Sequence, residues 1–268
     1  MRWVVGDIHG MLRPLSALIA HVTATDPAAQ LLFVGDYVNR GPDSRGVLDL
    51  LLSLQGDGRA RFVRGNHDDI FDMVLSGQSY AYHPDARTPL AAFLWFTHHG
   101  LMNTLTSYGI DELDVEWVRK RPSDDAIRKF LTAVPESHRR FIHDLPPVLE
   151  EKDLFIVHAM WDPDEPDDRP MADRLAADLR MRYAALWGRF TYEITRRKRW
   201  KRTGYFGHTP VETFRLSMRR GDNVPIHGPQ IVLLDTGAAL SANGRLSAVC
   251  AETGELVQMD RVGEVVDS

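Results

Sequence analysis

Short apolar runs that each lead into a glycine and a polar residue constrain this fold more than any other feature. The first three runs are residues 2–5, 31–34 and 61–64. They lead into Asp7, Asp36 and Asn66, which are spaced by 36 − 7 = 29 and 66 − 36 = 30 positions. That spacing is about the length of one β-α-β unit, and the intervening segments carry apolar residues at helical spacing. We therefore expect consecutive parallel β-α-β units in the first third of the chain.

Runs of the same kind return in the second half of the chain. They lie at residues 154–157, 204–206 and 231–234 and lead into His158, His208 and Asp235. Residues 84–150 are predicted to be mainly helical, and residues 162–170 form a loop rich in Pro and Asp. After His208 the pattern turns β-rich, with Asn243-Gly244 and Thr253-Gly254 as hairpin-turn signals. Without an internal repeat or a clear linker, a single domain over residues 1–268 is predicted.

Composition narrows the setting in which this chain works. The chain has 268 residues and a formal net charge of −5, so no stable nucleic-acid partner is implied by overall charge. Its single cysteine, Cys250, cannot form an intrachain disulfide, which fits a reducing compartment. No apolar run approaches the ~18 residues of a membrane span, and the first motif begins too early to leave room for a signal peptide. We expect a cytoplasmic protein without a membrane partner.

The polar residues at the strand ends are of the types that bind metal ions. Ligand sites of open α/β sheets lie beyond the carboxyl ends of the strands. The candidates there are Asp7, His9, Asp36, Asn66, His158 and His208. Oxygen and imidazole donors without thiolates suit Mn, Fe or Zn. Six such groups suit two ions about 3.5–4 Å apart that share a bridging carboxylate. The expected cofactor is a pair of divalent ions, with Mn placed first.

Three ordered motifs and two later histidines resemble the PPP family of metallophosphoesterases. The motifs are GDIHG at 6–10, GDYVNRG at 35–41 and RGNHD at 64–68, followed by the segments around His158 and His208. That family includes bacterial serine/threonine protein phosphatases and diadenosine tetraphosphate hydrolases. The resemblance runs from residue 6 to about residue 255. It implies an α/β fold, namely a calcineurin-like sandwich of two mixed β-sheets flanked by helices.

The resemblance also implies a role for each residue of the motifs. Asp7, His9 and His208 would hold one metal, Asn66 and His158 would hold the second, and Asp36 would bridge them. A metal-bridging hydroxide would attack phosphorus while His67 protonates the leaving group. Arg40 and Arg189 would bind phosphoryl oxygens, because a guanidinium offers a fixed fork of donors. Asn66 would also contact the substrate.

This chain departs from the protein-phosphatase pattern at three positions. Asn39 stands where those enzymes usually carry the aspartate that orients the catalytic histidine. Asp68 replaces their usual glutamate, and Met160 replaces a common glycine. Some diadenosine tetraphosphate hydrolases also lack that aspartate, so Asn39 stays among the catalytic candidates beside His67 and Arg40.

The sequence leaves more than one function open. The main prediction is a two-metal phosphomonoesterase, most like a bacterial protein phosphatase acting on phosphorylated protein, and the stretch TLTSYG at 104–109 favours it. The alternative is a hydrolase of diadenosine tetraphosphate or another nucleotide polyphosphate, which Asn39, Asp68 and the basic run at 196–202 favour. The intact ligand set argues against a third candidate, a catalytically dead phosphate-binding module.

Three smaller features also have alternative interpretations. The basic run at 196–202 is either a solvated helix face or the lining of the substrate entrance. Asp235 either hydrogen-bonds a ligand histidine or starts a turn. His98 and His99 are interpreted as structural.

Overall fold

Side chains alternate along each strand, so that one face of a sheet packs against helices and the other face packs against the second sheet. In β1 (Arg2–Val5), Trp3 and Val5 face a cluster that includes helix residues, whereas Val4 faces the opposite side. Neighbouring residues of a strand point to opposite faces of a sheet. In β5 (Leu154–Val157), Leu154 joins Val4 in the shared cluster, so the inner faces of two sheets meet there.

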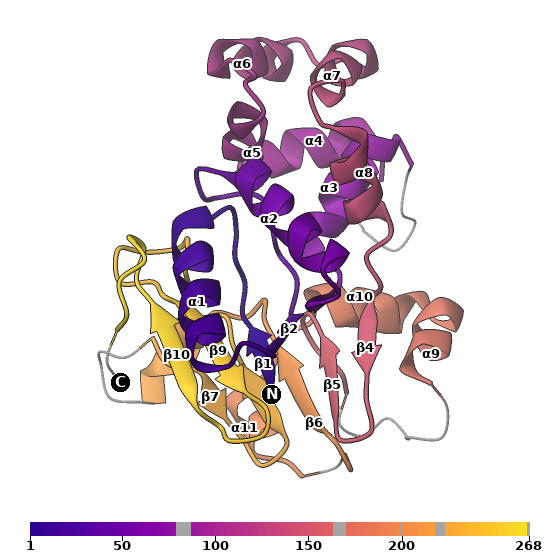
Figure 1. The fold of residues 1–268 in the computed structure, drawn as a ribbon. Coiled ribbons are helices and arrows are strands. Elements are labelled where there is room, and N and C mark those ends of the chain that lie inside the picture. Colours follow the sequence, from indigo (N-terminus) through magenta and orange to yellow (C-terminus); the bar gives the residue numbers. More distant parts are fainter. Residues whose placement is uncertain (79–86, 163–169, 199, 218–222, 267–268) are drawn as a thin grey trace.

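The structure is a computed structural model that describes residues 1–78, 87–162, 170–198, 200–217 and 223–266. The first sheet has the order β10-β9-β1-β2-β3, with β2 (Gln30–Phe33), β3 (Ala60–Phe62), β9 (Leu246–Cys250) and β10 (Leu256–Met259). The second has the order β4-β5-β6-β8-β7, with β4 (Val148–Glu150), β6 (Thr203–Phe206), β7 (Ile226–His227) and β8 (Ile231–Leu233). Each sheet combines parallel and antiparallel pairs. The predicted sandwich of two mixed sheets is confirmed (Figure 1).

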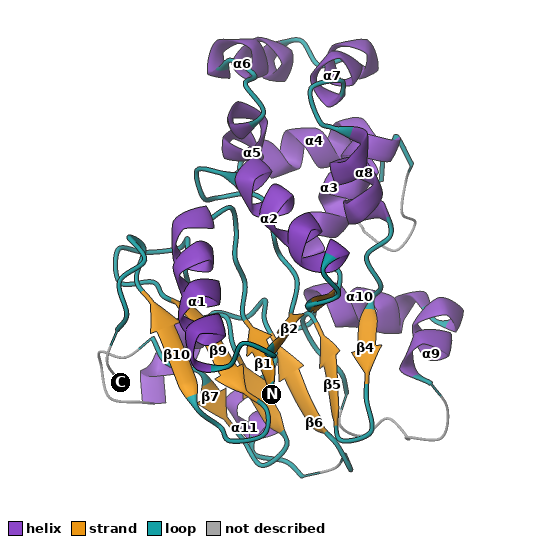
Figure 2. Cartoon of the chain, viewed as in Figure 1, coloured by secondary structure: helices purple, strands orange, loops and turns teal. Residues whose placement is uncertain are grey.

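Helices cover the outer faces and gather at one end of the sheets, as Figure 2 shows. The first part contains α1 (Leu12–Thr25), α2 (Ser44–Gly56), α3 (Asn66–Ser76), α4 (Pro89–Thr97), α5 (Leu101–Ser107), α6 (Glu112–Lys120), α7 (Asp124–Leu131) and α8 (Glu136–His143). The second part contains α9 (Met171–Ala177), α10 (Leu179–Trp187), α11 (Tyr192–Thr195) and a short 3-10 helix (Val211–Ser217). None of the helices in the described part of the chain has the length and apolar character of a membrane span.

The predicted β-α-β units are present as β1-α1-β2-α2-β3, and the strands pair in parallel. Asp43 caps α2 by accepting a hydrogen bond from the Gly46 N–H at 2.7 Å, a common role of aspartate directly before a helix. Thr253-Gly254 lies in the turn between the antiparallel strands β9 and β10. Asn243-Gly244 does not join two strands, because the segment before it makes only an isolated bridge from Gly237 to Arg245. Most of the predicted loop at 162–170 lies outside the described residues, and the single domain over residues 1–268 stays a prediction.

The basic run at 196–202 lies at the end of β6 opposite to His208. It precedes the amino end of β6, whereas His208 follows the carboxyl end. Within the run Trp200 is buried, and the Arg202 guanidinium donates to Glu150 at 3.1 Å, while residue 199 lies outside the described residues. The idea that this run lines the substrate entrance is therefore wrong, because β6 itself separates the run from the candidate ligands.

Arg2 links the two sheets at the end remote from the helices. Its guanidinium donates to Asp153 at 2.7 Å and to Glu151, both at the β4-β5 connection, and to Glu252 at 2.7 Å after β9. This network holds the pKa of Asp153 down to about 2, chiefly through the hydrogen bond from Arg2, and lowers the pKa of Glu252. Carboxylates with lowered pKa stabilise the folded state above their unfolded pKa of about 4 and lose that contribution as the pH falls towards 2.

We expect Arg2→Met to lower the free energy of unfolding at pH 7 by about 1–2 kcal/mol, the scale of a partly exposed ion-pair network. The difference from wild type should shrink between about pH 4 and pH 2 as the carboxylates become protonated. Urea unfolding across that range measures it. Arg245→Met is the matched control, because the Arg245 guanidinium donates to the neutral Gln258 amide. A pH-independent loss in Arg2→Met would contradict the electrostatic explanation.

Candidate metal centre

The two sheets bring their candidate ligands to one edge. Asp7 follows β1 and His208 follows β6, and the His208 backbone N–H donates to Asp7 Oδ2 at 2.9 Å. A Cβ atom on Gly207 would lie 1.9 Å from Asp7 Oδ1, so only glycine allows the two loops to approach this closely. The contact joins residues about 200 positions apart and fixes the sheets against each other at this edge.

Unusual backbone conformations coincide with the candidate residues. Among the described residues, the non-glycine positions with positive φ are His9, Asp36, Asn39, Arg40 and His208, at 48° to 72°. Such conformations are uncommon outside glycine and cost of order 1–3 kcal/mol each. Every one of them belongs to the predicted site, which indicates that the fold maintains this strain in order to aim those side chains.

Backbone carbonyls fix the tautomers of two histidines. His9 Nδ1 lies 3.0 Å from the Val38 carbonyl, and His158 Nδ1 lies 2.8 Å from the Val34 carbonyl. A ring N–H that donates to a carbonyl holds the ring so that the other nitrogen points into the site, and loss of the proton from that nitrogen gives the form that binds a metal. In both residues Nε2 therefore faces the centre.

Asp36 lies between these two histidines. Its Oδ2 is 3.4 Å from His9 Nε2, its Oδ1 is 3.4 Å from His158 Nε2, and Oδ1 also accepts the His67 backbone N–H at 2.9 Å. Burial works against ionisation of Asp36, but His158, His67 and His9 together outweigh burial and lower the pKa of this carboxyl. Burial likewise works against protonation of His158, yet Asp36 raises the pKa of that imidazole to about 9. Two groups of possible metal ligands share Asp36, namely His9-Asp36-His67 and Asp36-His158-His208. The shared Asp36 agrees with the predicted bridge. The groups differ from the predicted ligand sets, because His208 lies with His158 and not with His9, and His67 lies beside His9.

Asn66 connects the two distal histidines. Its Oδ1 lies 3.0 Å from His158 Nε2 and 2.9 Å from His208 Nδ1. Burial lowers the pKa of His208, and the charges of His158 and Arg189 lower it further. The Asn66 amide oxygen thus lies beside one nitrogen of each of these two histidines, where all three atoms could bind the same metal ion.

Two buried carboxylate oxygens show that the site suits cations. Asp7 Oδ1 and Asp235 Oδ2 are buried and have no hydrogen-bond partner in the described structure. Burial, together with the mutual repulsion of Asp7 and Asp235, raises the pKa of Asp7, and burial raises the pKa of Asp235 to about 6. Buried carboxylate oxygens that lack a donor are costly unless a cation compensates them. The donor set therefore fits divalent ions.

Asp68 and Thr104 hold the loops that carry the candidates, and the sequence analysis gave neither of them this role. Asp68 Oδ2 accepts the backbone N–H groups of Asp36 at 2.8 Å and Gly65 at 2.9 Å. Thr104 Oγ1 accepts the Asn39 backbone N–H at 2.8 Å. Asp68 belongs to the RGNHD stretch and Thr104 to the TLTSYG stretch, so both residues were within predicted motifs. Their hydrogen-bond partners lie in loops distant in sequence, which the motifs do not indicate.

Arg40, Asn39 and His67 join the same cluster, and Arg189 lies at its rim. Arg40 Nη1 donates to His9 Nε2 at 2.8 Å. Asn39 Nδ2 lies 3.0 Å from His67 Nδ1. Arg189 is exposed, and its charge acts on His208. The structure thus places the predicted residues in one region of the fold, with Arg189 at its edge, and their catalytic and metal-binding roles stay predictions.

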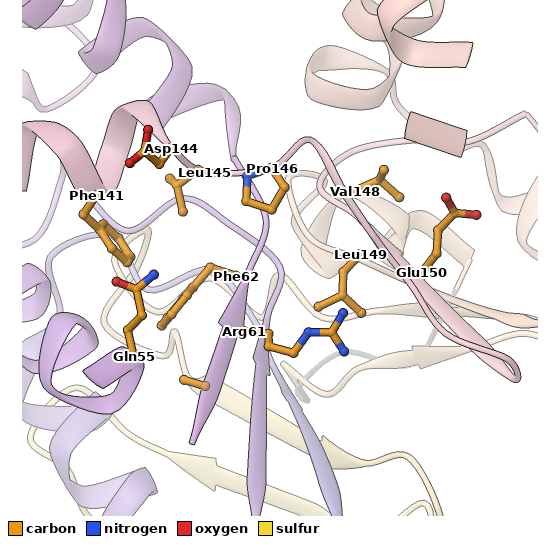
Figure 3. A pocket seen from close by; sticks show the side chains of 11 residues that line it. Gln55, Arg61, Phe62, Phe141, Asp144, Leu145, Pro146, Val148, Leu149 and Glu150 are labelled. Carbon is orange, nitrogen blue, oxygen red and sulfur yellow. The ribbon is translucent and has the colours of Figure 1, made fainter. Parts of the chain in front are cut away.

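A separate pocket of about 380 Å³ opens between the edges of the two sheets. Figure 3 shows its lining, which includes Gln55 from α2, Arg61 from β3, Phe141 from α8, Pro146 from the segment that follows α8 and Glu150 from β4. It contains none of the candidate ligands, so the chemistry is not assigned to this pocket.

A two-sheet sandwich with a buried carboxylate-imidazole centre and an arginine beside it defines a metallophosphoesterase, an enzyme that hydrolyses phosphoric esters. The chain belongs to the calcineurin-like phosphoesterase family, whose model matches residues 2–211. The resemblance expected from the motifs is therefore confirmed.

Curated relatives carry the name symmetrical bis(5'-nucleosyl)-tetraphosphatase. The protein from Ralstonia nicotianae is 50% identical over 73 residues, which cover 27% of this chain and 25% of that protein. The one from Enterobacter sp. is 36% identical over 120 residues, which cover 45% of this chain and 36% of that protein. The matched segments thus span about a third or less of these relatives.

Solved structures show the fold alone. A candidate diadenosine tetraphosphatase superposes with a TM-score of 0.55 at 22% identity, covering 96% of this chain and 92% of that one. A cold-active protein tyrosine phosphatase gives 0.53 at 14% identity, covering 99% and 77%. The names of the curated relatives support the nucleotide-hydrolase alternative more than the protein-phosphatase prediction.

Proposed function

We propose that this protein hydrolyses dinucleoside polyphosphates, with diadenosine tetraphosphate as the representative substrate. The observation that carries the proposal is the name shared by relatives up to 50% identical across a segment of this chain. Asn39 beside His67 agrees with it, because a phosphoanhydride releases a nucleotide phosphate that needs less protonation than an alkoxide does. The proposal replaces the phosphoprotein substrate of the main prediction.

Two divalent ions, proposed to be Mn, would be held by residues that follow strands of both sheets. Asp7, His9 and His208 would hold one, Asn66 and His158 the other, and Asp36 both. Such ions polarise phosphoryl oxygens and lower the pKa of a bound water. Asp235 would add negative charge beside Asp7 and stabilise the pair from outside the ligand set.

The remaining chemistry belongs to Arg40, Arg189 and His67. The Arg40 guanidinium would turn from His9 to phosphoryl oxygens, where its paired N–H groups match two acceptors. Arg189 at the rim would bind a phosphate farther along the polyphosphate chain. His67 would lie at the leaving group, held by Asn39 at Nδ1 and by Phe96, whose ring centre is 5.0 Å from its own.

A substrate panel with the Mn-loaded protein tests the proposal. Diadenosine tetraphosphate is compared with phosphoserine, phosphothreonine and phosphotyrosine peptides at equal concentration. We expect kcat/KM for the dinucleotide to exceed that of every peptide by roughly tenfold or more, with ADP as the product. Faster hydrolysis of any peptide than of the dinucleotide would restore the protein-phosphatase prediction.

Replacing Arg40 tests its assignment to phosphate. Arg40→Ala should lower kcat/KM by roughly 10²–10³, the range seen when one preorganised donor is lost. Bound Mn, measured by elemental analysis after gel filtration, should stay at the wild-type level, since the arginine is not a ligand. An intact rate, or loss of metal together with activity, would show that Arg40 has another role.

A further inference from the structure

Three aromatic side chains form a column beside the candidate metal centre. The rings of Trp95 from α4 and Trp187 from α10 stack with centres 5.5 Å apart at an interplanar angle of 24°. Tyr183, one turn before Trp187, stacks on Trp187 at 6.4 Å and 17°. We call Trp95, Trp187 and Tyr183 the aromatic column.

The aromatic column is in contact with the histidines of the site. Trp187 meets His208 edge to face, with ring centres 6.1 Å apart. Trp95 packs against Phe96, with ring centres 5.0 Å apart, and Phe96 packs against His67, also at 5.0 Å. A group lying along the column would therefore lie directly beside the position where phosphoester chemistry is proposed.

The exposure and surroundings of the column differ from those of a core cluster. Its three members are half-buried, whereas the neighbouring Phe93 and Phe96 are fully buried. Two arginines lie close to it. Arg189 follows Trp187 by two residues. Arg40 lies near His99, whose ring centre is 5.3 Å from that of Trp95, and burial first and then the charge of Arg40 lower the pKa of His99, so the histidine itself adds no positive charge. Half-buried aromatic rings near two arginines match a ligand that carries an aromatic ring on a chain of phosphates.

We propose that the aromatic column binds a nucleobase of the substrate while the two nearby arginines bind its phosphates. This inference rests on the proposed function and identifies the part of the site that would distinguish a nucleotide from a simple phosphate. Base-aromatic stacking contributes ~1–3 kcal/mol per base and accepts every base, because each has a π face. The column should therefore raise affinity for nucleotides without selecting adenine over guanine.

The test compares ADP with pyrophosphate as competitive inhibitors of p-nitrophenyl phosphate hydrolysis and measures KM for diadenosine tetraphosphate. The variants are Trp95→Leu and Tyr183→Leu, because Trp187 touches His208. We expect Ki for ADP and KM for the dinucleotide to rise roughly 10- to 100-fold, while Ki for pyrophosphate changes by less than about threefold. Trp95→Phe and Tyr183→Phe should restore most of the affinity, because they keep a stacking ring.

Trp117→Leu is the matched control, since it removes an aromatic ring that is 54% exposed on α6. It should leave all three constants unchanged, and circular dichroism melting checks that each variant folds. If wild type hydrolyses the dinucleotide but the leucine variants keep its KM and the Ki for ADP, the column does not bind the base although the proposed function holds. If wild type hydrolyses p-nitrophenyl phosphate but not the dinucleotide, the proposed function is wrong. In that case the comparison of ADP with pyrophosphate still decides whether the column binds a base. Equal changes in both Ki values in the leucine variants would show that it does not.

Discussion

Asp36→Asn is expected to abolish most activity, with kcat/KM falling by roughly 10³ or more because one carboxylate serves both proposed ions. Asp36 is the residue shared by the two possible ligand groups and lies 3.4 Å from both His9 and His158. Replacing it with a neutral amide of the same shape removes the negative charge between two cations and leaves them to repel each other. The affinity for the second ion should fall by more than about 100-fold, beyond the effect of removing an outer-sphere partner.

Isothermal titration with Mn and steady-state kinetics measure the two effects separately. Asp49→Asn is the matched control, because Asp49 also pairs with a histidine but lies away from the candidate metal centre. Its Oδ1 is 3.0 Å from His138 Nε2. It should bind two ions with unchanged affinity. Two-ion binding at wild-type affinity in Asp36→Asn would rule out a bridging role.

The strand-end ligands were predictable because their signal is local. Each candidate follows an apolar run directly, and the carboxyl ends of parallel strands share one edge of a sheet, so Asp7 and Asp36 could be brought together from spacing alone. The same rule placed His158 and His208 at that edge, although they follow strands of the second sheet. No pattern in the intervening helical segment gives the reason why that sheet packs on the first with its ligands at the same edge. The structure supplies that reason in the cluster shared by Val4 and Leu154.

Contacts between distant segments were beyond the reach of the sequence pattern. Trp95 and Trp187 are 187 − 95 = 92 positions apart, and their stacking depends on α4 and α10 meeting across the site. The short strand β4 has only three residues and offers no periodicity to detect. The interpretation of the basic run at 196–202 as a lining of the substrate entrance failed for a related reason. The run is close to His208 in sequence, but β6 separates the two in space.

Hydrogen bonding around His67 predicts which substrates need that residue. Thr104 Oγ1 donates to Asn39 Oδ1 at 2.8 Å, which leaves the Asn39 Nδ2 group facing His67 Nδ1 at 3.0 Å. An amide that donates to Nδ1 favours the neutral imidazole, whereas a carboxylate there would accept a proton from Nδ1 and favour the charged form. A histidine held in this way is a weaker proton donor than one beside aspartate. The arrangement suits leaving groups that depart without a proton.

His67→Gln is therefore expected to affect substrates unequally. Hydrolysis of phosphoserine, whose alkoxide needs a proton, should fall by about 10², the low end of the range of general acid catalysis, because His67 beside Asn39 is already a weak proton donor. Hydrolysis of diadenosine tetraphosphate and p-nitrophenyl phosphate should fall by less than about tenfold, because their leaving groups are stable anions. The companion variant Asn39→Asp should act in the opposite direction and raise phosphoserine hydrolysis more than p-nitrophenyl phosphate hydrolysis. Initial rates on the three substrates, with metal content verified for each variant, measure both effects. Equal losses on all three substrates in His67→Gln would show that His67 orients the substrate or the metal centre and does not supply a proton.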